Sequence, residues 1–149
     1  MKYLLDTHTF LWSAFEPRKL SRPAVAAIQD SDSALFLSIA SLWEVAILQS
    51  LGRIELKVDI PEIVELADSE LGATLLPIEP VHIDKVRNLP FHHRDPFDRL
   101  LIAQCLTLAS RVSQLAAGKR VSAWQRENAV RTTRMARMLR HMHSRPVGS

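Results

Sequence analysis

Short apolar runs alternate along the chain with longer segments in which apolar residues recur at helical spacing. The short runs, bounded by polar residues, predict buried strands. The longer segments predict helices, several with Pro or a capping residue at the start. Strands that alternate with helices favour a parallel sheet with helices on both faces. The predicted strands are residues 2–5, 34–38 and 74–78, and the predicted helices are residues 7–15, 21–29, 40–51, 61–72, 79–87 and 96–110.

Length and composition favour one globular domain. The chain has 149 residues, 47% of them hydrophobic, which is enough for a sizeable core. No apolar run approaches the roughly 20 residues of a membrane span. An acid at position 6 argues against a signal peptide. The single cysteine, Cys105, cannot form an intrachain disulfide and is expected to be buried and inert. We therefore expect a cytoplasmic protein.

Charge divides the chain into two unequal parts. Residues 111–149 contain nine Lys and Arg and a single acid, Glu127, for a net charge of +8, so the remaining residues carry −5. From about residue 122 to residue 143 the spacing predicts a basic amphipathic helix. Such a helix could contact nucleic acid or an acidic partner, or could simply be a solvated face. We divide the chain into a domain at residues 1–110 and a basic C-terminal segment at residues 111–149.

The most informative stretch is residues 92–104, where a charged start leads into an apolar helical run. Asp95 suits the N-cap of a helix and Pro96 its first position. Asp98 follows three residues after Asp95, so both carboxylates should lie on one face of the helix. An ordinary capped helix with an acidic first turn would have the same pattern.

Two further acids lie in apolar surroundings. Asp6 ends the first predicted strand, and Glu44 lies within the apolar segment 42–48. Each has a structural alternative: Asp6 could cap the next helix, and Ser41-x-x-Glu44 could be a capping box. Parallel topology would nevertheless bring both acids to the edge of the sheet where ligands bind in such folds.

Four carboxylates at one edge of a sheet would repel each other and attract a cation. Oxygen ligands favour Mg²⁺ or Mn²⁺ over zinc. Such a cation can activate a water for attack on a phosphodiester. The flanking basic residues could hold a phosphate backbone, although they could also be ordinary surface charge. The candidate metal ligands are Asp6, Glu44, Asp95 and Asp98, and the flanking residues are His92, His93, Arg94 and Arg99.

The order and spacing of these motifs resemble the PIN domain family, in particular its VapC-type toxin ribonucleases. The segments that carry the resemblance span residues 1 to about 110. They are Tyr3-Leu-Leu-Asp6-Thr-His8, Ser38-Ile-Ala-Ser-Leu-Trp-Glu44-Val-Ala-Ile47 and His93-Arg-Asp-Pro-Phe-Asp98-Arg-Leu-Leu-Ile-Ala-Gln104.

The resemblance implies a three-layer α/β/α sandwich with a central parallel sheet. It implies a Mg²⁺- or Mn²⁺-dependent endoribonuclease, the toxin of a type II toxin–antitoxin pair, which forms a homodimer and is inhibited by a cognate antitoxin. Asp6, Glu44 and Asp98 would be the catalytic acids and Asp95 an accessory metal ligand. Thr7 would add a hydroxyl near the metal and, with His93, Arg94 and Arg99, would contact the RNA substrate.

The chain departs from the family pattern after residue 110. The family usually continues with a short strand ending in Thr-x-Asp or Ser-x-Asp, which supplies a last acid. Here no Asp occurs after Asp98, and an Arg-rich segment follows. Three interpretations therefore stay open: an active ribonuclease, a PIN-fold module that binds an antitoxin or RNA without cleaving it, or a structural domain whose acids only cap helices.

Overall fold

A parallel sheet forms the centre of the molecule. The computed structural model describes residues 1–90 and 94–118, with only the backbone course of the helix for residues 110–118. In this part of the chain the strands are β1 (Lys2–Leu5), β2 (Ala34–Ser38) and β3 (Thr74–Leu76), in the order β1-β2-β3. Both pairings are parallel, with Leu5 opposite Leu37 and Leu37 opposite Leu75. The three predicted strands and their parallel pairing are confirmed.

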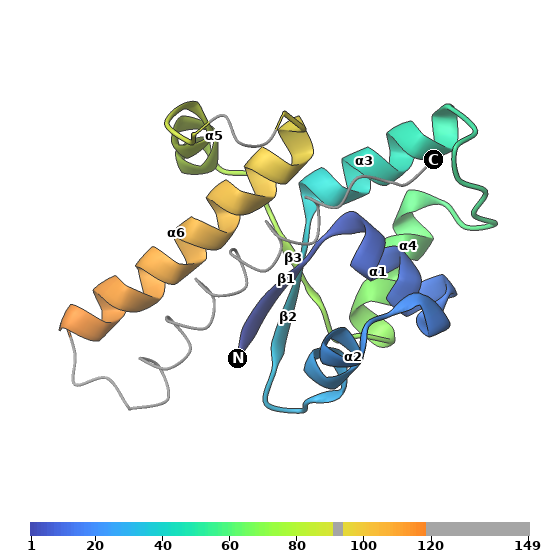
Figure 1. Cartoon of the computed structure of the whole chain (residues 1–149), viewed down its shortest axis with the longest axis horizontal. Coiled ribbons are helices and arrows are strands. Elements are labelled where there is room, and N and C mark those ends of the chain that lie inside the picture. The colour runs from blue at the N-terminus through green and yellow to red at the C-terminus, as the bar shows by residue number, and fades with distance from the viewer. Residues whose placement is uncertain (91–93, 119–149) are drawn as a thin grey trace.

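Helices cover both faces of this sheet (Figure 1). One side carries α1 (Thr7–Phe15), α2 (Arg22–Gln29), α3 (Ile39–Ser50) and α4 (Ile60–Ser69), with the short 3₁₀ helix η1 (Pro17–Lys19) after α1. The other side carries α5 (Pro80–Arg87) and α6 (Pro96–Gly118). This arrangement is the α/β/α sandwich that the sequence predicted.

The two faces of the strands fill two separate apolar cores, because successive side chains of a strand point to opposite faces. Leu5 and Leu37 join Phe10 of α1 and Val45 of α3 in the larger core. Leu4 lies on the opposite face, in a smaller core with Leu76 of β3 and Leu101 and Cys105 of α6. Burial of Cys105 raises the pKa of its thiol to about 12, which makes the side chain the inert core residue that was expected.

Helix boundaries agree closely with the sequence pattern at most positions. Ser21 caps α2 as predicted, and Gly52 follows α3 with a positive φ of 65°, a conformation that glycine adopts without steric cost. The main difference is α6, which continues to Gly118 instead of ending near residue 110. The helix expected near residues 122–143 lies outside the described residues. Within the described part, no helix is both long enough and apolar enough to cross a membrane.

Candidate active site

The carboxyl ends of the strands meet at one edge of the sheet, and a buried hydrogen-bond network fixes them there. Ser38 at the end of β2 donates its hydroxyl hydrogen to Gln104 Oε1 of α6 at 2.7 Å. The side-chain amide of Gln104 donates to the carbonyl of Pro77, just after β3, at 3.1 Å. Ser38 and Gln104 are both fully buried. The network therefore holds α6, which carries two of the predicted acids, against the ends of β2 and β3.

Asp6 lies directly after β1 and is buried. Its Oδ1 accepts a hydrogen bond from the backbone N–H of Thr9 at 2.6 Å, so Asp6 is the N-cap of α1. The structural alternative for Asp6 is thus correct. It does not exclude a second role, because the cap uses Oδ1 and leaves the other carboxylate oxygen outside the cap.

Glu44 has a different environment from the one that a capping box would give it. The N-cap of α3 is Ser38, whose hydroxyl accepts from the N–H of Ala40 at 3.0 Å, so the proposed Ser41 capping box is wrong. The Glu44 carboxylate instead accepts a hydrogen bond from the hydroxyl of buried Thr7 on α1. Ser41 lies three residues before Glu44 on the same helix, buried, and its hydroxyl has no hydrogen-bond partner among the described residues.

The electrostatics of Glu44 identify its other neighbours. Burial raises the pKa of the Glu44 carboxyl above its ordinary value, and the hydrogen bond from Thr7 opposes this. The negative charges of Asp95 and Asp98 raise that pKa further, whereas His8 lowers it. Two acids from α6 and one histidine from α1 are therefore close enough to influence the carboxyl of α3.

Asp95 and Asp98 begin α6 as the sequence predicted. Asp95 Oδ1 accepts from the N–H of Phe97 at 2.8 Å and from that of Asp98 at 3.3 Å, which makes Asp95 the helix cap. Asp95 is exposed and Asp98 is half-buried in the first turn. The negative charges of both acids act on the Glu44 carboxyl. The start of α6 and the second turn of α3 therefore form one acidic surface.

The donor chemistry of this surface fits a hard divalent cation. All four candidate side chains are carboxylates, and the hydroxyls of Thr7 and Ser41 add neutral oxygen atoms nearby along α1 and α3. In the described residues, however, no three His, Cys, Asp or Glu side chains converge closely enough to hold a metal ion. The structure thus brings Glu44 together with Asp95 and Asp98, and places Asp6 at the adjoining strand end, without closing a ligand shell.

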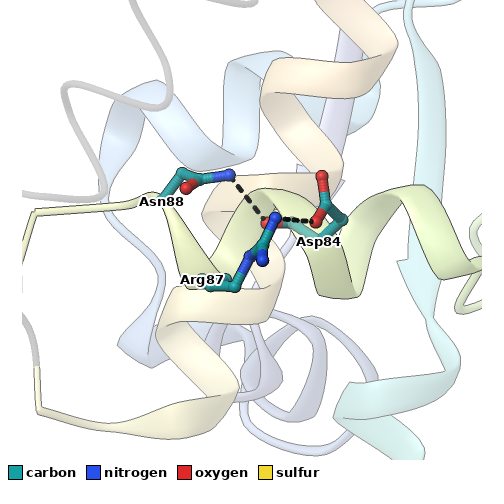
Figure 2. A network of polar contacts seen from close by, with 3 residues as sticks. All are labelled: Asp84, Arg87 and Asn88. Carbon is teal, nitrogen blue, oxygen red and sulfur yellow. Dashed lines mark hydrogen bonds and ion pairs between the residues drawn. The ribbon is translucent and has the colours of Figure 1, made fainter.

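Arg99 requires a correction. Predicted to contact substrate, it is only 8% exposed. Its guanidinium donates to the carbonyls of Val86 at 2.9 Å, Leu89 at 3.1 Å and Pro90 at 2.9 Å. Arg99 therefore caps the end of α5 and the loop that follows, because the last carbonyls of a helix lack intrahelical donors. The exposed polar contacts at this end of α5 come from Arg87 and Asn88, which both donate to Asp84 (Figure 2).

The other predicted substrate contacts have mixed outcomes. Arg94 is exposed on the segment before α6, where a phosphate could reach it. Thr7 is buried and bonded to Glu44, so its hydroxyl orients an acid and does not lie open to substrate. His92 and His93 lie outside the described residues.

His8 is a candidate that the sequence reasoning did not select. It is exposed in the first turn of α1, its ring contacts that of Trp12 at 5.9 Å between centroids, and its charge acts on the Glu44 carboxyl. Its place two residues after Asp6 in the first motif could have identified it.

Comparison with known proteins agrees with this architecture. A family model for the PIN domain matches residues 3–120 of the 149-residue chain. Neither the search of curated proteins nor the search of solved structures gave a match. The match covers all three motifs and therefore all four candidate acids, Asp6, Glu44, Asp95 and Asp98.

Proposed function

The chain belongs to the PIN domain family, and from this premise we propose that it is a divalent-metal-dependent endoribonuclease. PIN domains are typically metal-dependent nucleases. One observation carries the proposal for this chain: Glu44, an acid within an apolar helix, is bonded by Thr7 and is close to Asp95 and Asp98. Partial burial of a charged group in such surroundings is costly unless the group is paired or binds a cation. Glu44 does not cap its helix, because the N-cap of α3 is Ser38.

The acids have distinct roles in this proposal. Asp6, Glu44 and Asp98 hold Mg²⁺ or Mn²⁺, and Asp95 is an accessory ligand. When bound, the cation supplies positive charge next to the phosphodiester and lowers the pKa of nearby water. Thr7 orients the Glu44 carboxylate through its hydroxyl. Exposed Arg94 contacts the RNA phosphates, and His93, which precedes it in sequence, is proposed to do the same.

We also propose that the protein is the toxin of a type II toxin–antitoxin pair and acts on RNA in the cytoplasm. The support is the sequence resemblance of the three motifs to VapC-type toxins. The proposal includes a homodimer and a cognate antitoxin that inhibits the nuclease. Expression of the chain alone should arrest growth of a bacterial host, and expression of the Glu44→Gln variant at the same level should not.

The nuclease assignment is tested by incubating purified protein with end-labelled RNA and Mg²⁺ or Mn²⁺. Wild type should cleave the RNA, and EDTA should stop cleavage. Asp6→Asn and Glu44→Gln should abolish cleavage while their circular dichroism spectra match wild type. Arg87→Met is the control, because Arg87 is exposed and pairs with Asp84 of its own helix, so it should be dispensable.

Two results would contradict the assignment. Full cleavage by either acid variant would show that these carboxylates are not the metal ligands. RNA that is bound equally well with and without EDTA, and is never cut, would identify a binding module in place of a nuclease.

A further inference from the structure

A pair of aromatic rings, exposed Trp43 and half-buried Phe97, lies beside the acidic surface. Trp43 of α3 and Phe97 in the first turn of α6 meet edge to face, with 5.3 Å between ring centroids and 73° between planes. Trp43 is 59% exposed, so the contact with Phe97 leaves most of the indole open. It immediately precedes Glu44 in sequence, and Phe97 lies between Asp95 and Asp98. Both rings therefore belong to the two helical turns that supply the acids.

The exposure of Trp43 is unusual for a residue of its kind. Aromatic side chains bury large areas in most folded proteins. Ile39, one turn before Trp43 on the same face of α3, is also exposed. The two rings contact each other across α3 and α6, two helices that are packed together, so they are close before any ligand arrives. An open aromatic surface next to the proposed site of phosphodiester cleavage is suited to stacking.

We propose that the Trp43–Phe97 pair is a stacking surface for one unpaired base of single-stranded RNA, next to the phosphate that is cleaved. This inference rests on the proposed function, because the acids position that phosphate. Stacking uses the π-face that every base has, so it gives affinity without strong sequence preference.

Charge favours a base as the occupant. Residues 1–110 carry a net charge of −5, and the surface beside Trp43 contains Glu44, Asp95 and Asp98. Phosphates are repelled by such a surface unless a cation is present, whereas an uncharged base can contact the rings without that repulsion. The second ring pair, His8 with Trp12 on α1, also lies on an element that faces Glu44. Aromatic rings thus occur on two helices around the acid.

The test measures binding of fluorescein-labelled single-stranded RNA by anisotropy in EDTA, where metal-dependent cleavage does not interfere. Trp43→Leu keeps an apolar side chain but removes the aromatic face, and should weaken binding about tenfold, a loss of about 1.4 kcal/mol. Trp43→Phe should retain most of the affinity. Leu51→Ala is the matched control, because Leu51 is equally exposed, at 60%, at the other end of α3 and should leave binding unchanged.

A second ligand separates base stacking from contacts to the phosphate backbone. An oligonucleotide of the same length with abasic nucleotides keeps the phosphates and lacks bases. Wild type and Trp43→Leu should bind it with equal affinity.

The outcomes distinguish this inference from the proposed function. Unchanged RNA binding by Trp43→Leu with normal cleavage would overturn the stacking surface alone. Tenfold weaker binding by Trp43→Leu, in a wild-type protein that never cleaves RNA, would support the stacking surface and overturn the nuclease. Dissociation of a dimer by Trp43→Leu, with RNA affinity intact, would overturn stacking and assign the rings to contact with a second copy.

Discussion

Replacing Arg99 by Met should destabilise the fold without acting through RNA. Methionine keeps an unbranched apolar side chain in the same space but removes every hydrogen-bond donor. The carbonyls of Val86, Leu89 and Pro90 would each lose a guanidinium hydrogen bond. The perturbation therefore tests whether this arginine is part of the structure or part of the substrate site.

The size of the effect follows from the bonds that are lost. A hydrogen bond to a charged group contributes about 1.5–3 kcal/mol, and less where water can replace the donor, as at exposed Pro90. Val86 loses less, because its carbonyl also accepts from the N–H groups of Asn88 and Leu89 at the end of α5. Allowing for this, we expect the free energy of unfolding to fall by about 2–3 kcal/mol. For a domain of this size, that corresponds to a drop in Tm of about 5–10 °C.

The assay is thermal unfolding followed by circular dichroism, with Arg87→Met as the matched control. Arg87 lies at the same end of α5 and pairs with Asp84 at 2.7 Å, but the two side chains are 75% and 65% exposed (Figure 2). An ion pair in water contributes about 0–1 kcal/mol, so the control should change Tm by no more than about 3 °C. An Arg99→Met variant with the Tm of wild type and weaker RNA binding would refute the reasoning and restore the phosphate contact.

Three further predictions follow from the site. Gln104→Leu removes the buried bonds to Ser38 and Pro77 and should lower the free energy of unfolding by about 2–3 kcal/mol, measured in urea; a loss below about 0.5 kcal/mol would contradict a structural network. Without divalent ions, the raised pKa of Glu44 means that the folded state binds more protons than the unfolded state above the ordinary carboxyl pKa. Stability should therefore fall as pH rises above the ordinary carboxyl pKa, and the Tm of Glu44→Gln should rise relative to wild type as it does; a constant difference would argue against it. Thr7→Val should weaken Mn²⁺ binding about tenfold by calorimetry while Thr7→Ser retains it, and equal affinities would show that the hydroxyl does not orient the acid.

The fold could be predicted almost completely, because its determinants are local and repeat along the chain. The alternation of apolar runs with helical spacing located β1, β2 and β3, and the capping residues located most helix starts. The end of α6 was predicted too early, near residue 110, although residues 111–117 contain neither proline nor glycine and the helix ends at Gly118.

The candidate site was predicted less completely, because its contacts join residues that are distant in sequence. The acids could be selected from their apolar context and their positions at strand ends. The bond from Thr7 to Glu44 spans 37 residues, and nothing in the local pattern distinguishes it from the Ser41 capping box. Arg99 was assigned to substrate for the same reason: its burial against the end of α5 depends on the packing of α5 against α6.

The most direct test of the central claim, that these carboxylates form a metal site, is thermal unfolding with and without Mn²⁺ or Mg²⁺. A ligand that binds only the folded state at 100 times its Kd adds about 2.7 kcal/mol. We therefore expect Tm of wild type to rise by about 5–10 °C at saturating metal, and Tm of Glu44→Gln to be unchanged by it. An equal rise in both proteins, or no rise in wild type, would contradict a metal site at Glu44.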